Sequence, residues 1–175
     1  MRIGTIVLGV FVLGTSTTSA VVAQQKPLAS PRDSVSATIS GAKVEVNYGR
    51  PSMKGRLVVG GLIPYDEVWR TGANEATSLV TSKMLMIGNL MVPAGKYTLY
   101  TLATKTGWKL IVNKQTGQWG TEYKPEMDLG RVDLKLESLA TAVEQFAIKI
   151  VPNGTAGTLR LEWDKTAASV SFMVH

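Results

Sequence analysis

Residues 131–137 read Arg-Val-Asp-Leu-Lys-Leu-Glu, and this strict alternation of charged and apolar side chains is the clearest structural signal in the chain. Successive side chains of a β-strand point to opposite faces of a sheet, so Val132, Leu134 and Leu136 are expected to face a core while their neighbours face water. The same period returns on both sides of the dipeptide Asn153-Gly154, in Phe146, Ile148 and Ile150 before it and in Leu159, Leu161 and Trp163 after it. The pattern predicts an antiparallel hairpin.

Alternation of the same kind extends over most of the chain. It recurs in residues 34–48 around a Ser40-Gly41-Ala42 turn, in residues 85–92 around Gly88-Asn89, and in residues 96–112, where Ile111 falls on the outward side. About nine strands result, with a short helical turn expected at residues 139–145. Turn signals every 8 to 12 residues are typical of an all-β fold. We predict an antiparallel β-sandwich, with a closed β-barrel as the alternative; the long polar loops favour the sandwich.

The N-terminus has the layout of a secretory signal peptide. Arg2 is followed by an apolar run over residues 3–13 and by small residues up to Ala23. The apolar run is shorter than the roughly 20 residues that cross a bilayer, which favours cleavage over an uncleaved anchor. We expect a signal peptide over residues 1–23, with cleavage after Ala20 as the alternative to cleavage after Ala23, a polar segment over 24–33 and one domain over 34–175. The mature protein is expected to be periplasmic or extracellular, without membrane insertion.

Composition excludes several classes of site. The chain has no cysteine, so it has no disulfide, no thiol nucleophile and no cysteine-bound metal. Its one histidine is His175, the last residue, which is poorly placed as a general base or a fixed metal ligand. Without Arg2 the charge balance is 18 Lys+Arg against 13 Asp+Glu, or +5. Because the cations are scattered and lack interleaved aromatic residues, we expect no nucleic-acid binding, and we expect no metal or cofactor.

The alternation stops in residues 48–77, a segment rich in polar side chains. Loops longer than about 12 residues in compact domains are usually functional or disordered, and the apolar residues of this one argue against disorder. Arg50, Lys54 and Arg56 occur without an intervening acid, which suggests a pocket for an anion. The alternative is that Arg50 and Arg70 pair with the acids of the same segment, which are Asp66, Glu67 and Glu75.

Short motifs spread over residues 28–174 carry a resemblance. They are Ser30-Pro31-Arg32, Gly49-Arg50-Pro51-Ser52, Lys54-Gly55-Arg56, Pro64-Tyr65, residues 68–77 (Val-Trp-Arg-Thr-Gly-Ala-Asn-Glu-Ala-Thr), residues 93–97, Asn113-Lys114, Gln118-Trp119-Gly120 and Leu161-Glu162-Trp163. With these motifs the chain resembles the exported bacterial proteins grouped as domain of unknown function 2911. The resemblance implies an exported one-domain protein and implies no activity or cofactor. Asp66-Glu67 departs from the Gly-Lys-like pair common in the family, which makes the segment more acidic.

Three functions are compatible with these residues. The first is a binding module for an anionic small molecule, a glycan or an envelope component. The second is a hydrolase of an envelope or extracellular polymer with Glu75 or Asp66 as its acid or base, and the third is a structural envelope protein. Trp119 lies in a Gly-rich stretch and is the best candidate for an exposed aromatic residue, whereas Trp108 and Trp163 are in phase with the core. The candidate ligand-binding residues are Arg50, Lys54, Arg56, Trp69, Arg70, Asn74, Glu75, Asn113, Lys114 and Trp119.

Overall fold

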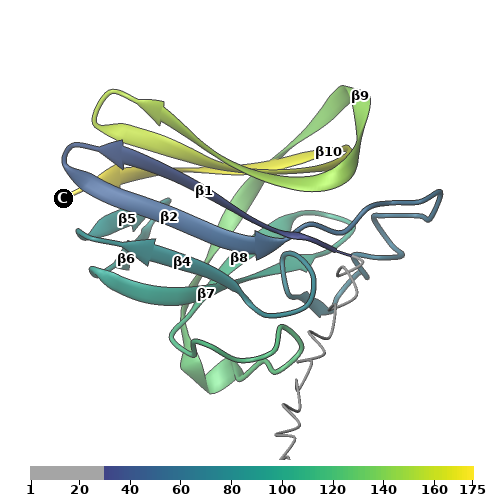
Figure 1. Cartoon of the computed structure of the whole chain (residues 1–175), viewed down its shortest axis with the longest axis horizontal. Coiled ribbons are helices and arrows are strands. Elements are labelled where there is room, and N and C mark those ends of the chain that lie inside the picture. The colour runs from purple at the N-terminus through teal and green to yellow at the C-terminus, as the bar shows by residue number, and fades with distance from the viewer. Residues whose placement is uncertain (1–29) are drawn as a thin grey trace, which may run out of the picture.

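The computed structural model describes residues 30–175 (Figure 1). The expected signal peptide and most of the expected polar segment lie outside these residues. The strands are β1 (Arg32–Ile39), β2 (Ala42–Gly49), β3 (Val68–Trp69), β4 (Thr77–Thr81), β5 (Leu85–Ile87), β6 (Leu90–Val92), β7 (Gly95–Ala103), β8 (Trp108–Asn113), β9 (Asp128–Asn153) and β10 (Ala156–Val174), and a 3₁₀ turn spans Pro125–Met127. Within the described part of the chain, no helix has the length and apolar character needed to cross a membrane.

All ten strands belong to one antiparallel sheet. Its order is β1-β2-β4-β7-β8-β9-β10-β5-β6, and β3 pairs with β7 off this path. The all-β antiparallel prediction is confirmed, with ten strands where about nine were expected. A closed barrel is wrong, because β1 and β6 end the sheet without pairing to each other. The hydrogen bonding is continuous, so it does not divide the strands into two separate sheets.

The long strands β9 and β10 bend the sheet over its own inner face. The first part of β9 pairs with β8, and its later part pairs with β10. In Figure 1 the β9–β10 ribbon arches over β1 and β2. The hydroxyl of Tyr48 in β2 accepts a hydrogen bond of 2.9 Å from the backbone N–H of Ile148 in β9, which joins the two halves of the sheet. One core is therefore enclosed between them.

The predicted helical turn at residues 139–145 is wrong, because this stretch is part of β9. The pairing with β10 is irregular here, and Asp164 of β10 has a φ of 51°. None of residues 135–145 is buried, so neither face of this bend has to be apolar. The sequence here therefore lacks the alternation that would have indicated a strand. For the same reason Leu136, expected to face the core, is 42% exposed.

The turns follow the sequence signals closely. Ser40 and Gly41 both have positive φ between β1 and β2, and Gly88 has a φ of 55° between β5 and β6, as the Gly-Asn dipeptide predicts. The β9–β10 turn is centred on Gly154 and Thr155, one residue later than expected, because Asn153 pairs with Ala156.

An aromatic cluster fills the core at one end of the sheet. Trp69 stacks on Trp163 with ring centroids 5.8 Å apart and an interplanar angle of 20°, and it meets the edge of Phe146 at 5.0 Å. The rings of Tyr48 and Phe146 also meet edge to face, with centroids 5.7 Å apart. The expectation that Trp108 and Trp163 belong to the core is confirmed. Phe146 touches the other three rings and is the centre of this cluster.

We expect Phe146→Ala to lower the free energy of unfolding by about 3–5 kcal/mol, the usual cost of removing a buried phenylalanine. The matched control is Val151→Ala on the same strand, which removes an exposed side chain and is expected to change stability by less than about 0.5 kcal/mol. Urea denaturation followed by tryptophan fluorescence measures both. Similar values for the two variants would contradict the assignment of Phe146 to the centre of the core.

Candidate functional site

The long polar segment after β2 is ordered by contacts with distant strands. Met53 and Pro51 exchange backbone hydrogen bonds with Glu144 and Phe146 of β9. Further along, β3 pairs with β7, which places Trp69 opposite Thr101. Because neighbouring side chains of a strand point to opposite faces, Trp69 enters the core and Arg70 follows at the rim of the sheet.

The backbone after Arg70 is held in an uncommon conformation. Thr71 has a φ of 51° and Asn74 a φ of 63°, values that are rare for residues other than glycine, above all for a β-branched one. The Thr71 hydroxyl lies 2.8 Å from that of Thr101, and Thr77 donates a 2.8 Å hydrogen bond to the Thr71 carbonyl. The chain also passes so close to β2 that a Cβ on Gly49 would lie 2.1 Å from the Ala73 carbonyl oxygen. Backbone strain of this kind is found preferentially at functional sites.

A second polar segment, residues 114–122, packs against the first. The Gly120 N–H donates to the Asn74 carbonyl at 3.0 Å, and the Ala76 N–H donates to the Gln118 carbonyl at 3.1 Å. A Cβ on Gly120 would lie 2.5 Å from Cδ of Arg70. The position of Arg70 is therefore limited by the backbone of residues 114–122.

Two cavities meet at Arg70. The cationic cavity, of about 180 Å³, is lined among others by Arg56, Arg70 and Asn74. The aromatic cavity, of about 300 Å³, is lined by Leu62, Pro64, Val68, Trp69, Arg70, Tyr100, Gly120, Thr121 and Tyr123. Leu62, Trp69 and Arg70 line both. We refer to the two together as the Arg70 site.

The arginines of this site differ from the other arginines of the described residues in that they form no ion pair. Residues 30–175 contain six arginines. Four of them pair with carboxylates, in the pairs Arg32–Glu75, Arg50–Asp33, Arg131–Asp128 and Arg160 with Glu137 and Glu162. Within this range Arg56 donates only to the backbone carbonyls of Ser52 and Met53, and Arg70 only to that of Gly72 at 3.4 Å. The two arginines without a carboxylate in this part of the chain thus line the same cavity.

Two of the candidate charges are used elsewhere. Arg50 pairs with Asp33 at 3.1 Å and donates to the Phe146 carbonyl, which ties β2 to β1 and β9. Glu75 pairs with Arg32 at 2.8 Å and lines a separate cavity of about 330 Å³ with it. The expected pairing of Arg50 and Arg70 with the acids of their own segment is wrong, because Arg50 pairs across strands and Arg70 pairs with no carboxylate of the described residues.

The remaining candidates lie outside the Arg70 site. Lys54 and Lys114 are exposed, and Trp119 is 46% exposed. Asn113 is fully buried, and its amide donates to the Lys124 carbonyl and to Asp128, so its role is to order residues 114–128. Of the candidate residues, the structure brings together Arg56, Trp69, Arg70 and Asn74.

Two tyrosines of the site were not among the candidates. Tyr100 and Tyr123 contact each other with centroids 4.8 Å apart, and both line the aromatic cavity. Burial, together with a hydrogen bond to Asp128, raises the pKa of Tyr123 to about 12, so its hydroxyl stays neutral. The sequence did contain a signal for Tyr100. Alternation in residues 96–102 places it on the face opposite Leu99, and a large aromatic residue on the outer face of a sheet indicates a candidate binding surface.

The two candidate acids, Glu75 and Asp66, do not line the Arg70 site. Hydrogen bonds from its own backbone and from Arg32 hold the pKa of Glu75 below its usual range, so at neutral pH this residue is ionised, has no proton to donate and is a weak base. Asp66 and Glu67 are exposed. Among the residues that the structure describes, no three of His, Cys, Asp and Glu gather closely enough to hold a metal.

We expect Gly120→Ala to displace Arg70 and to destabilise the protein by about 1–3 kcal/mol, because the added Cβ meets the Arg70 side chain and the Asn74 carbonyl. Gly107→Ala is the matched control, since a Cβ there meets nothing within 4 Å and its φ is unexceptional. Thermal unfolding and the amide NMR shifts of residues 70–76 report both effects. Unchanged shifts in Gly120→Ala would show that Arg70 is positioned in another way.

Of three comparisons with known proteins, only the one with protein families found a match. Comparisons with curated proteins and with solved structures found none. The family described as "Protein of unknown function (DUF2911)" matches residues 30–172, which include β1 to β9, all of β10 but its last two residues, and both segments of the site. The chain therefore belongs to this family.

Proposed function

We propose that the protein is a binding module for a small organic anion, whose charged group binds at Arg70 and Arg56 and whose apolar or aromatic part lies in the aromatic cavity. The observation that carries this proposal is the lack of a carboxylate partner for these two arginines among residues 30–175, although the other four arginines there are all paired.

The position of Arg70 favours an anionic ligand. Its side chain is half-buried, and a guanidinium removed from water without a counter-ion is costly. A carboxylate or phosphate would restore this loss through two parallel hydrogen bonds, which match the planar fork of arginine. The terminal nitrogens of Arg70 make no hydrogen bond to the described residues, so both remain available.

The aromatic cavity explains why a simple inorganic ion is not the best ligand. Its wall is formed by Trp69, Tyr100 and Tyr123, with Pro64 and Val68 beside them. Small-molecule sites are mostly apolar with a few polar groups that fix orientation, and they begin at about 300 Å³. The two cavities together suit one small molecule with a charged end and an apolar end.

The scaffold also favours a binding role. Strands β3, β7 and β9 are joined in the bent sheet, and we infer that this sheet works as a sandwich-like support that holds both segments of the site in place. Segments that are held in place before a ligand binds lose little conformational entropy on binding.

We expect phenyl phosphate and benzoate to bind, and the neutral analogue benzyl alcohol to bind at least about tenfold more weakly, because it lacks the charge that Arg70 pairs with. Arg70→Gln is expected to weaken the binding of both anions by about 1.5–3 kcal/mol with little change in melting temperature. Isothermal titration calorimetry measures the affinities.

Lys105→Gln is the control for a general loss of positive charge, since Lys105 is exposed and lies in the β7–β8 turn. Equal losses in Arg70→Gln and Lys105→Gln would indicate non-specific attraction. The absence of binding by every anion at millimolar concentration would contradict the proposal.

We also propose that the protein is exported, which the leader-like residues 1–23 support. Expression of the full chain in a bacterium is then expected to yield a protein that begins at Gln24, and intact mass with N-terminal sequencing measures this. Replacement of three residues of the apolar run by charged residues is the control and should keep the leader uncleaved. A product that retains Met1 or Arg2 in the unmodified chain would contradict export by this route.

A further inference from the structure

A row of methionines crosses the outer face of the sheet at its β6 edge. Met173 of β10 lies directly opposite Met86 of β5, and Met86 lies directly opposite Met91 of β6. All three point away from the core, because their neighbours Phe172, Leu85, Ile87 and Val92 are buried. Directly opposite side chains on antiparallel strands have Cβ atoms about 4.5–5.5 Å apart.

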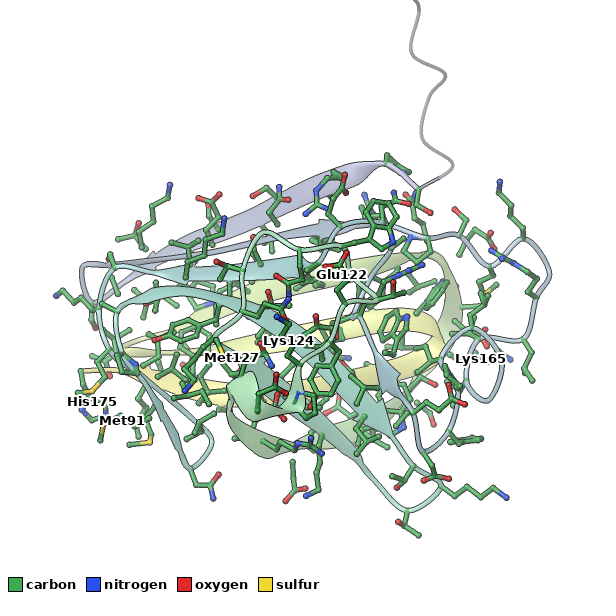
Figure 2. The ribbon with its side chains drawn as sticks, turned by 90° about the horizontal axis from the view of Figure 1, so that it is seen from below. Met91, Glu122, Lys124, Met127, Lys165 and His175 are labelled. Atoms are coloured by element: carbon green, nitrogen blue, oxygen red, sulfur yellow. The ribbon has the colours of Figure 1, made fainter. Side chains whose placement is uncertain are left out.

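His175 and Met84 extend this row by one step. The N–H of His175 donates to the carbonyl of Met84 at 3.0 Å, which continues the β10–β5 register beyond Val174 and Leu85. Side chains two residues apart share a face, so His175 lies on the side of Met173 and Met84 on the side of Met86. Figure 2 shows Met91 and His175 at the same edge of the molecule, with sulfur atoms beside them.

The composition makes this grouping unusual. The chain has seven methionines and one histidine, and four of the methionines share this surface with that histidine. Met91 and Met173 are 54% and 51% exposed, although methionine is ordinarily a core residue. The face therefore gathers most of the sulfur of a protein that has no cysteine.

We propose that Met86, Met91, Met173 and His175 form a binding site for Cu(I), with Met84 as an additional ligand. Thioether sulfur is a soft ligand that selects Cu(I), and imidazole also binds copper. All of these ligands are neutral, which suits a monovalent cation better than a divalent one. Three rotatable bonds in each methionine allow sulfur atoms from adjacent strands to approach one ion.

The proposal departs from the expectation about His175. A histidine at the end of the sequence was expected to be unsuited as a fixed ligand, but its backbone N–H is hydrogen-bonded to Met84, the residue before β5. The site is independent of the Arg70 site, because it is built from β5, β6 and β10 and shares no residue with either cavity.

The test uses Ag(I) as a redox-inert probe and Cu(I) supplied without oxygen. With methyl-¹³C methionine in the protein, we expect one equivalent of Ag(I) to shift the signals of Met86, Met91 and Met173 and to leave those of Met53 and Met127 in place. Competition with a coloured Cu(I) chelator is expected to give a 1:1 complex. Met86→Leu should weaken it at least about tenfold, because loss of even an outer-shell partner costs about 10–100-fold.

Met127→Leu is the matched control, since it removes a thioether of the 3₁₀ turn that is not part of this row, and it is expected to leave Cu(I) affinity unchanged. The triple change Met86→Leu, Met91→Leu and Met173→Leu keeps the side chains apolar and of similar volume, so it should fold and lose binding. Retained affinity in the folded triple variant, or uniform small shifts of all methionine signals with Ag(I), would overturn the proposal.

Discussion

The packing of Trp69, which stacks on Trp163 and meets Phe146 edge to face, is the contact on which the rest of the structure depends. Residues 50–76 contain only two residues of regular strand, and these two are the ones that bring Trp69 to β7 and into the core. Once Trp69 is buried, the next residue, Arg70, is placed at the rim of the sheet. The close approach of Gly49 to Ala73 then fixes the course of the backbone after Arg70. The same ring is a core side chain and a wall of both cavities, so stability and the candidate site share one residue.

A second constraint is that the sheet is covered on its outer face near β7 and β8. Ile111 was expected to face water and is instead fully buried, as is Tyr100. Residues 114–127 lie over this face, held by Asn113 and by the bond from the Tyr100 hydroxyl to the Glu122 carbonyl. The Arg70 site lies where this covering segment meets residues 70–76. A face buried by a loop keeps polar groups such as Gln118 and Thr98, and these groups distinguish it from the apolar inner core.

The two proposed sites differ in chemistry and in origin. The Arg70 site uses hard, charged donors on irregular segments that need distant contacts to hold them. The proposed Cu(I) site of Met86, Met91, Met173 and His175 uses soft, neutral ligands on or next to regular strands, where the register alone brings the side chains together. A scaffold without cysteine can carry both, because neither depends on a disulfide for its geometry.

The sequence by itself determined most of the strands, the approximate positions of the turns and most of the core, because apolar periodicity and turn residues are local properties. It gave no signal for β3, and it predicted a helical turn inside β9. It also pointed to residues 48–77 as the segment of interest. Only the tertiary structure decided which charged side chains of that segment are free to bind a ligand. Arg50 forms an ion pair with Asp33, and Glu75 forms one with Arg32, and both partners lie outside the segment. It also decided that four methionines share one face of the sheet with His175, since β10 reaches β5 only after the bent β9–β10 ribbon returns across the core. The choice of an ion-pair partner or a neighbouring strand depends on which surfaces the sheet brings together, and no local pattern contains that information.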